Sequence, residues 1–341
     1  MLLLAAFAGM VACFTSIDFY GLHQSLRESD NSQNKISMLN YELFIKNYGK
    51  HYLTIEEKNL RYQIYLKNVK EINELQNSGK ISHKLAVNQF ADMTNDEYIN
   101  YAGLHKTKLN DAQECAEKHT SDTNKADIDW MIKGAVTNIK DSGPWGPCCT
   151  DHAFSAIAAV EALYITNGHI PTNLSEQEVI ECAYEGITGC NAWTDTAFNY
   201  IMNVGITADI QYPYIGRQEN CKNTSVSHVF KIKGCKDITY QDLDALQDAL
   251  NINVISISIC AECFAFQFYS SGVIQSYCCT EVDHRVALVS SGIEDGTAYW
   301  KIKNSWGRHW GDVGYVKVLK ETGKNSPGMC GIAMEASYPI A

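Results

Sequence analysis

Two adjacent cysteines and an aspartate precede an apolar, helix-like segment in the stretch DSGPWGPCCTDHAFSAI at residues 141–157. Apolar residues recur at helical spacing after Ala153, so a buried helix is expected to begin just before it. A thiol at a helix N-terminus ionises readily because the helix dipole stabilises the thiolate, which is a strong nucleophile. An aspartate there would instead accept hydrogen bonds from free backbone N–H groups. The stretch therefore raises the question whether Cys148, Cys149 or Asp151 stands at the reactive position.

A second group of cysteines has the spacing C-x-x-C, at Cys260 and Cys263. No second pair and no histidine cluster stands at zinc-like spacing, so an extra bridge or free thiols are favoured over a metal. We expect no metal and no cofactor.

The N-terminal part of the chain has the pattern of long amphipathic helices. Residues 41–78 are rich in Lys, Glu, Leu and Tyr, and Gly49 is the sole glycine or proline among them. Six residues recur at steps of three or four and share one helix face: Glu57, Arg61, Tyr65, Asn68, Ile72 and Gln76. Next comes KLAVNQFADMTNDEY, in which Thr94 and Glu97 form a capping box that begins another helix. The polar residues 103–126 are expected to be an exposed linker and a natural cleavage site.

The remaining chain changes from helical to strand-like patterns. AFSAIAAVEALYI predicts a buried helix, and Ser175 with Glu178 predicts the start of a second one. After about residue 227, apolar or alternating runs such as NVISISI, RVALVSSG and GYVKVLK predict strands. A helical half followed by a β half indicates an α+β protein with a cleft between the halves.

These segments, in this order, resemble the papain family of cysteine proteases in its cathepsin L-like branch. The resemblance rests on the Glu57 to Gln76 face, AVNQFAD, IDWMIKGAVTNIKD, LSEQEVIEC, DHRV, YWKIKNSWGRHWGDVGY and CGIAMEASYP. It implies a papain-like two-lobed fold, with a helical left domain and an antiparallel β-barrel-like right domain, preceded by a helical prosegment. The implied domains are a signal peptide at 1–16, a prosegment at 17–122 and a peptidase domain at 123–341. Within the prosegment, the inhibitory core is about 41–100 and the linker about 103–122.

The resemblance also assigns catalytic roles. In the family a thiolate attacks the peptide, an imidazole protonates the leaving amine, and an asparagine orients the imidazole. The matching residues are His284 in DHRV and Asn304 in KNSWG, with Trp306 shielding the asparagine contact. The family's C-G-[SA]-C-[WY] signature is missing, and three residues are inserted between Gly143 and Ala153.

Two alignments of this insertion are possible. In the first, Asp151 takes the nucleophile position and Cys148 becomes a structural cysteine. In the second, Cys149 or Cys148 is the nucleophile, separated from AFS by an extra helical turn. The resemblance implies bridges Cys148 with Cys190, Cys182 with Cys221, and Cys279 or the adjacent Cys278 with Cys330. The first alignment is favoured because only there does Cys190 have a partner. Loss of that disulfide would remove ~2–5 kcal/mol of stability.

Other departures from the family fall in the same cleft. Ser142 replaces the glutamine of the oxyanion hole and is too short to substitute for it. Trp193 replaces a glycine of the substrate-binding strand, while Arg285 and Glu335 lie at the main specificity pocket and could pair with each other. We therefore predict a cysteine endopeptidase by descent whose catalysis is impaired. The alternative is an active endopeptidase that uses Cys149, or Cys148, with His284 and Asn304.

Composition sets the compartment and the partners that we expect. The 341 residues carry a net charge of −11, which repels nucleic acid and anionic membranes. The apolar run MLLLAAFAGMVACFTS is too short to span a bilayer and resembles a signal peptide. Thirteen cysteines suit an oxidising compartment. We therefore expect a monomer of the secretory route, extracellular or in a lysosome or vacuole, whose partners are its own prosegment and a peptide or protein ligand.

Overall fold

The computed structural model describes residues 37–104, 106, 115–120, 126–143, 150–183, 193–222 and 227–341. The chain divides into two compact units, Met1–Lys67 and Asn68–Ala341. The expected signal peptide at 1–16 lies outside the described residues. Among the residues described, no helix is long and apolar enough to cross a membrane.

The described part of the first unit is helical and is held together by aromatic side chains. Residues 37–47 form a helix, and α2 (Ile55–Asn77) begins in this unit and continues into the second. The Tyr65 ring packs against the rings of Tyr41 and Phe44, with centroids 5.2 and 5.1 Å apart. All six residues of the predicted α2 face are buried or half-buried, which confirms an amphipathic helix.

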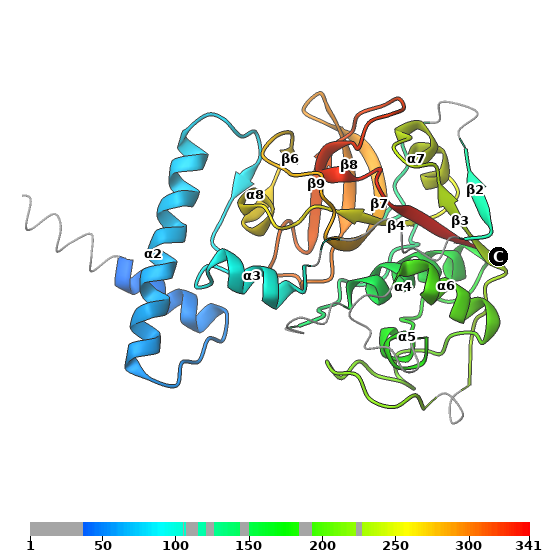
Figure 1. Cartoon of the computed structure of the whole chain (residues 1–341), viewed down its shortest axis with the longest axis horizontal. Helices are drawn as coiled ribbons and strands as arrows, with labels where there is room; N and C mark the ends of the chain where they lie inside the picture. The colour runs from blue at the N-terminus through cyan, green and yellow to red at the C-terminus, as the bar shows by residue number, and fades with distance from the viewer. Residues whose placement is uncertain are drawn as a thin grey trace, which may run out of the picture. The chain divides into compact units, whose positions relative to one another are not determined.

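The second unit combines helices with a sheet (Figure 1). Its helices are α3 (Asn95–Ala102), α4 (Asp151–Thr166), α5 (Glu176–Cys182), α6 (Thr194–Asn203), α7 (Leu243–Leu250), α8 (Phe264–Gln267) and the 3-10 turn η4 (Met329–Gly331). The strands are β1 (Lys84–Leu85), β2 (Glu117–His119), β3 (Gly234–Ile238), β4 (Ile255–Ile259), β5 (Tyr269–Ser271), β6 (Val273–Ile274), β7 (His284–Glu294), β8 (Thr297–Lys303), β9 (Tyr315–Leu319) and β10 (Ala336–Ile340).

Eight of these strands form one sheet in the order β2-β3-β10-β4-β7-β8-β9-β6. The β2/β3 and β6/β9 pairs are parallel, and the other neighbours are antiparallel. The α+β class is thus confirmed, but the strand order is that of an open sheet and not of the expected barrel-like domain. Strands β4 and β7 lie in the middle of this sheet. Nearly all their side chains are buried, as their apolar runs predicted.

Helix α4 packs against strands β4, β7 and β10 and against helices α5 and α6. Its small residues Ala153, Ala156 and Ala159 are fully buried, which allows close approach of the neighbouring elements. Two predicted helix starts are confirmed. Thr94 and Glu97 form a complete capping box at α3, and the Ser175 hydroxyl accepts the Glu178 N–H at α5.

The disulfides agree only in part with those that the resemblance implies. Cys182 is joined to Cys221, the pair that the resemblance implied. Cys330 is joined to Cys278 and not to Cys279, because Cys279 is bonded to Cys260 of the C-x-x-C pair. A further bridge joins Cys115 to Cys235 and was not predicted. The expected bridge between Cys148 and Cys190 lies outside the described residues.

Part of the predicted linker belongs to the sheet. Residues 117–119 form β2, which pairs with β3. Side chains 116–118 are exposed as predicted, but Cys115 is buried, with 5% of its surface accessible. The segment 115–120 is therefore not a free linker.

Candidate active site

The site lies where the start of α4 meets the start of β7. Asp151 is the first residue of α4, and His284 is the first residue of β7. Packing of α4 on β7 brings Asp151 Oδ2 within 3.1 Å of His284 Nδ1. Asp151 is 4% exposed and His284 1%. In the described part of the chain, a carboxylate therefore faces this imidazole nitrogen.

The opposite nitrogen of the ring faces Asn304. His284 Nε2 lies 2.9 Å from Asn304 Oδ1, and that oxygen also accepts the Ser305 backbone N–H at 2.8 Å. The backbone donor identifies the Asn304 atom as the carbonyl oxygen, so Nε2 must donate. Nδ1 must also donate, because its partner is a carboxylate. The bonds at both nitrogens therefore fit an imidazolium cation paired with the Asp151 anion.

The Asp151 carboxylate is bonded on both oxygens. Its Oδ1 accepts the His152 N–H at 2.7 Å, and its Oδ2 accepts the Arg285 N–H at 2.7 Å. Burial would raise the pKa of Asp151, but the hydrogen bond from His284 and the charge of Arg285 hold that pKa well below its usual range. Asp151 is thus an anion whose oxygens accept hydrogen bonds from the protein, and these bonds make it a weak nucleophile toward an amide.

Arg285 links this centre to the expected specificity pocket. Its guanidinium lies 5.0 Å from the Trp193 ring centroid, in cation–π geometry. Its Nε is 3.6 Å from Glu335 Oε1, so the two residues pair as the sequence suggested. Ser258 Oγ donates to the other Glu335 oxygen at 2.7 Å. Arg285 is 5% exposed, so its side chain is enclosed by these contacts.

Trp306 covers the imidazole. Its ring stacks on His284 with centroids 4.7 Å apart. Phe90 and Tyr98 of the expected prosegment meet Trp306 edge-on, and Gln89 Nε2 donates to the Trp306 carbonyl at 3.0 Å. The segment 84–102 therefore packs over the side chain that shields His284.

Ser142, at the expected oxyanion position, is held by its backbone. Its N–H donates to the Ser305 carbonyl at 2.8 Å, and its carbonyl accepts the Tyr214 hydroxyl at 2.6 Å. The first bond places Ser142 against Ser305, the residue that follows Asn304. The side chain of Ser142 is shorter than that of a glutamine and cannot reach as far.

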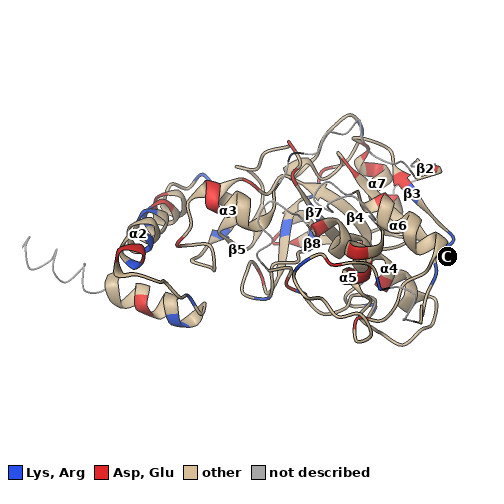
Figure 2. Cartoon of the chain, turned by 60° about the horizontal axis from the view of Figure 1, so that its bottom comes forward, with Lys and Arg blue, Asp and Glu red and all other residues tan. Residues whose placement is uncertain are grey.

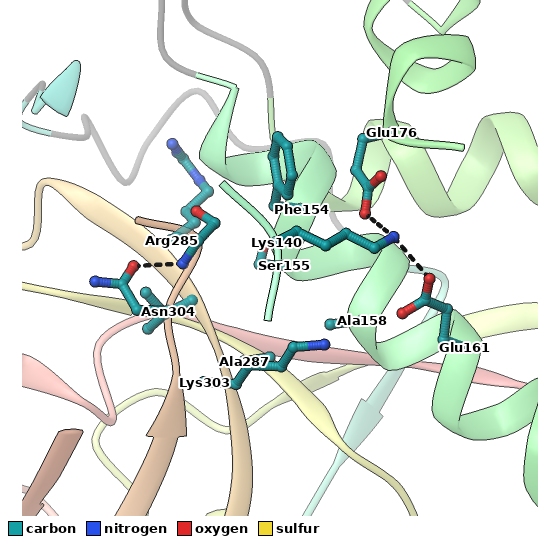
Figure 3. Close-up of a pocket in the computed structure, with 12 residues that line it drawn as sticks. Lys140, Phe154, Ser155, Ala158, Glu161, Glu176, Arg285, Ala287, Lys303 and Asn304 are labelled. Atoms are coloured by element: carbon teal, nitrogen blue, oxygen red, sulfur yellow. Dashed lines mark hydrogen bonds and ion pairs between the residues drawn. The ribbon is translucent and has the colours of Figure 1, made fainter. Parts of the chain in front are cut away.

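A buried charge network lies next to the site and was missed by the sequence analysis. Lys140 Nζ lies between Glu161 Oε1 of α4 and Glu176 Oε1 of α5, at 2.8 and 2.5 Å (Figure 3). Burial raises the pKa of Glu176 to about 7 and lowers that of Lys303, which lines the same cavity, to about 8. The cavity measures about 20 Å³, room for roughly one water. Lys140 stands 21 residues before Glu161 and 36 before Glu176, a spacing that carries no periodic signal, so only the fold reveals the network.

Three of the predicted site residues are not described by the structure. Cys148, Cys149 and Cys190 lie outside the described residues. Two clusters of potential metal ligands occur in the described ranges, Cys115, Asp195 and Cys235, and Cys260, Glu262 and Cys279. All four of these cysteines are in disulfides, so none offers a thiolate to a metal.

An imidazole set between a helix N-terminus and an asparagine, on an α+β scaffold with a preceding helical segment, defines the class of papain-like peptidases and their precursors. A family model described as papain family cysteine protease matches residues 124–340, and one described as cathepsin propeptide inhibitor domain matches residues 41–98. The chain therefore belongs to the papain family of cysteine proteases, with a cathepsin-type propeptide domain.

Several plant enzymes and precursor structures are similar to this chain. It is 42% identical to thiol protease SEN102 of Hemerocallis sp. over 299 residues, which cover 84% of this chain and 81% of the relative. It is 37% identical to cysteine protease XCP2 of Arabidopsis thaliana over 342 residues, 97% of this chain and 94% of the relative. Recombinant stem bromelain precursor matches with a TM-score of 0.80 and 32% identity, covering 89% of this chain and 98% of that one. Procathepsin L 3 of the Tenebrio molitor larval midgut matches with a TM-score of 0.77 and 32% identity, covering 89% and 99%.

Proposed function

We propose that this papain-family protein has lost most of its endopeptidase activity and acts by binding a peptide or protein ligand. The observation that carries the proposal is the bond between the Asp151 carboxylate and His284 Nδ1, at 3.1 Å. In the catalytic scheme of the family, a thiolate occupies the place next to this imidazole. A carboxylate is a far weaker nucleophile toward an amide, and no activating partner for it is apparent in the described residues.

Three further features support impaired catalysis. The donors on both oxygens of Asp151 stabilise the anion and lower its nucleophilicity. Ser142 lacks the amide donor expected in the oxyanion hole, and loss of one such donor costs roughly 2.7–4 kcal/mol of transition-state stabilisation in a different protease. The paired Arg285 and Glu335 occupy the expected specificity pocket.

The competing function is an active cysteine endopeptidase that uses Cys149, or Cys148, with His284 and Asn304. Cys149 stands two positions before Asp151, the first residue of α4, so it is near the helix start in sequence. Against it, Nδ1 of His284 is already engaged by Asp151. The two functions differ in whether a reactive thiol depends on His284.

The proposal includes the origin and processing of the protein. The chain enters the secretory route with a signal peptide at 1–16 and acts as a monomer outside the cell or in a lysosome or vacuole. The prosegment at 17–122, with its inhibitory core at about 41–100, covers the peptidase domain at 123–341 and inhibits ligand binding in cis. The contacts of Gln89, Phe90 and Tyr98 with Trp306 support this inhibitory role.

The deciding experiment is covalent labelling by a thiol-directed epoxide at mildly acidic pH, after removal of the prosegment. We expect no label on Cys148 or Cys149 and no peptide hydrolysis. Label sites are mapped by mass spectrometry because Cys263 is a free thiol among the described residues. Labelling of Cys149 that disappears in a His284→Ala variant would establish the active enzyme instead.

A restored nucleophile gives the matched positive control. In Asp151→Cys, a thiol takes the place of the carboxylate beside Nδ1, so we expect epoxide labelling at residue 151 that His284→Ala abolishes. Adding Ser142→Gln supplies the missing donor, and we expect it to raise hydrolysis of a peptide substrate by a further ~10²-fold. A folded Asp151→Cys protein that stays unlabelled would contradict the assignment of residue 151 to the nucleophile position.

A further inference from the structure

A short segment of the expected linker is built into the sheet of the peptidase domain. Strand β2 runs parallel to β3, with Glu117, Lys118 and His119 opposite Lys236, Asp237 and Ile238. Figure 1 shows β2 beside β3 at the edge of the sheet. By its place in the sequence, this segment falls within the expected prosegment at 17–122, which maturation would remove.

The N-terminal end of the segment is anchored covalently. Cys115 is bonded to Cys235 of β3, and both residues are buried. The Cys115 N–H also donates to Asp237 Oδ2 at 2.9 Å. The bridge closes a separation of 120 residues, which gives a disulfide a large effect on the entropy of the unfolded chain.

The C-terminal end is anchored by polar contacts. The His119 carbonyl accepts the Thr239 N–H at 3.1 Å and its hydroxyl at 2.9 Å. The His119 ring meets the Tyr338 ring of β10 edge-on, and its Nδ1 lies 3.0 Å from the Tyr338 hydroxyl. Glu117 adds an ion pair with Lys236 at 2.8 Å.

These contacts also serve the sheet itself. Without β2, strand β3 would be an edge with unpaired backbone groups, which is a template for unwanted strand pairing. The segment 115–120 therefore behaves as an integral strand of the peptidase domain and not as a tether to the prosegment alone.

We propose that residues 115–120 stay bonded to the peptidase domain when the prosegment is cut, so that β2 is retained in the mature protein. A cut before Cys115 leaves β2 as a new N-terminal strand. A cut between residues 120 and 126 leaves the whole prosegment joined through Cys115 to Cys235. This proposal holds whether or not the site is catalytic.

The second cut gives a protein whose prosegment is released by reduction. A tether keeps a cleaved segment at an effective concentration near the millimolar range, so it continues to occupy its site. A dithiol reductant breaks the Cys115–Cys235 bond by giving two electrons. The two cysteines become thiols, and the dithiol is oxidised to a disulfide.

The test uses the full-length protein with the recognition sequence of a site-specific protease inserted between Asp122 and Thr123. After cleavage, the sample is run on a denaturing gel without reductant and analysed by mass spectrometry. We expect one cross-linked species that separates into two chains when dithiothreitol is added, and a non-reduced peptide map with Cys115 linked to Cys235. Two separate chains without reductant, or a different partner for either cysteine, would overturn the proposal.

The matched control carries the same insertion with Cys115→Ser and Cys235→Ser together, so that neither thiol is left to mispair. We expect this control to separate into two chains without reductant. On native gel filtration at high dilution, the bridged protein should keep one prosegment per peptidase domain, while the control loses it. Equal loss from both proteins would show that the bridge does not retain the segment.

Discussion

At the scale of single residues, Asp151 is the centre of the site because its carboxylate bonds both the imidazole of His284 and two backbone N–H groups. A catalytic thiol cycles between a thiolate and a covalent intermediate. The Asp151 carboxylate instead holds one stable ion pair with His284 and accepts N–H bonds from His152 and Arg285. Under the function proposed above, Asp151 therefore serves as a structural anion beside the imidazole.

The first prediction concerns the stability that Asp151 provides. Asp151→Asn removes the anion that is bonded to the buried His284 ring, and breaking a buried ion pair costs ~3–5 kcal/mol of unfolding free energy. Because folding lowers the pKa of Asp151, its contribution is present above the ordinary value of 3.8 and is lost as pH falls below it. Denaturant unfolding between pH 7 and pH 2 measures both effects.

The wild-type protein should therefore lose its advantage over Asp151→Asn as the pH falls below about 4. Ser142→Ala is the comparison, because it removes a hydroxyl from a half-exposed residue of the same site and should change stability by less than ~0.5 kcal/mol. An Asp151→Asn protein as stable as the wild type at pH 7 would show that the ion pair contributes nothing.

At the scale of elements, the segment from β1 through α3 is bound to the loop around α8 by backbone and side-chain bonds. Strand β1 pairs with β5, and the Ala86 N–H donates to the Phe268 carbonyl at 2.9 Å. Asn88 Nδ2 donates to the Gln267 carbonyl at 2.6 Å, and the Tyr98 hydroxyl donates to the Ala261 carbonyl at 2.8 Å. The docking of this segment therefore depends on a few buried polar groups.

The second prediction tests one of them. Asn88→Ala removes the donor to Gln267 and the acceptor of the Phe90 N–H, so buried groups lose their partners. We expect the free energy of local opening of residues 84–102 to fall by ~1–3 kcal/mol. Amide hydrogen exchange on the uncleaved protein measures this opening.

The control is Asn100→Ala on α3, where the exposed side chain bonds only to the Asp96 carbonyl of its own helix among the contacts described. Its effect should stay within ~0.5 kcal/mol. Equal protection of residues 84–102 in the Asn88→Ala and wild-type proteins would refute the role given to Asn88.

At the scale of the whole molecule, the excess of acidic residues limits the partners. The chain carries 28 basic and 39 acidic side chains. Acidic residues lie on α4 and α5 as well as on other elements (Figure 2), and several of them, such as Glu161, Glu176 and Glu178, are buried. The charge therefore acts partly inside the molecule and partly as a repulsive field around it.

The third prediction follows from that field. A net charge of −11 opposes approach to a phosphate backbone and to anionic lipids. We expect no retention on a duplex oligonucleotide or on phosphatidylserine vesicles at low salt, measured by fluorescence anisotropy and by sedimentation. If the protein binds the oligonucleotide or the vesicles, and the binding weakens as salt is raised, the prediction is wrong. The protein then has a basic surface despite its negative net charge.

The sequence was sufficient for the features that depend on local pattern and on motifs. The helical periodicity of residues 57–76 reported the buried face of α2, and the Thr94 and Glu97 spacing reported a capping box, because both arise from neighbours on one helix. The motifs around His284 and Asn304 were enough to place the chain in the papain family.

Only the tertiary structure decided the features that join distant segments. Cys278 and Cys279 are almost equally far from Cys330 in sequence, and the direction of each sulfur depends on the folded backbone, so pattern could not choose between them. The bridge from Cys115 to Cys235 and the β2/β3 pairing join segments about 120 residues apart. The contact of Asp151 with His284 likewise spans 133 residues and exists because α4 packs on β7. Such contacts arise from the packing of whole elements, which no short stretch of sequence encodes.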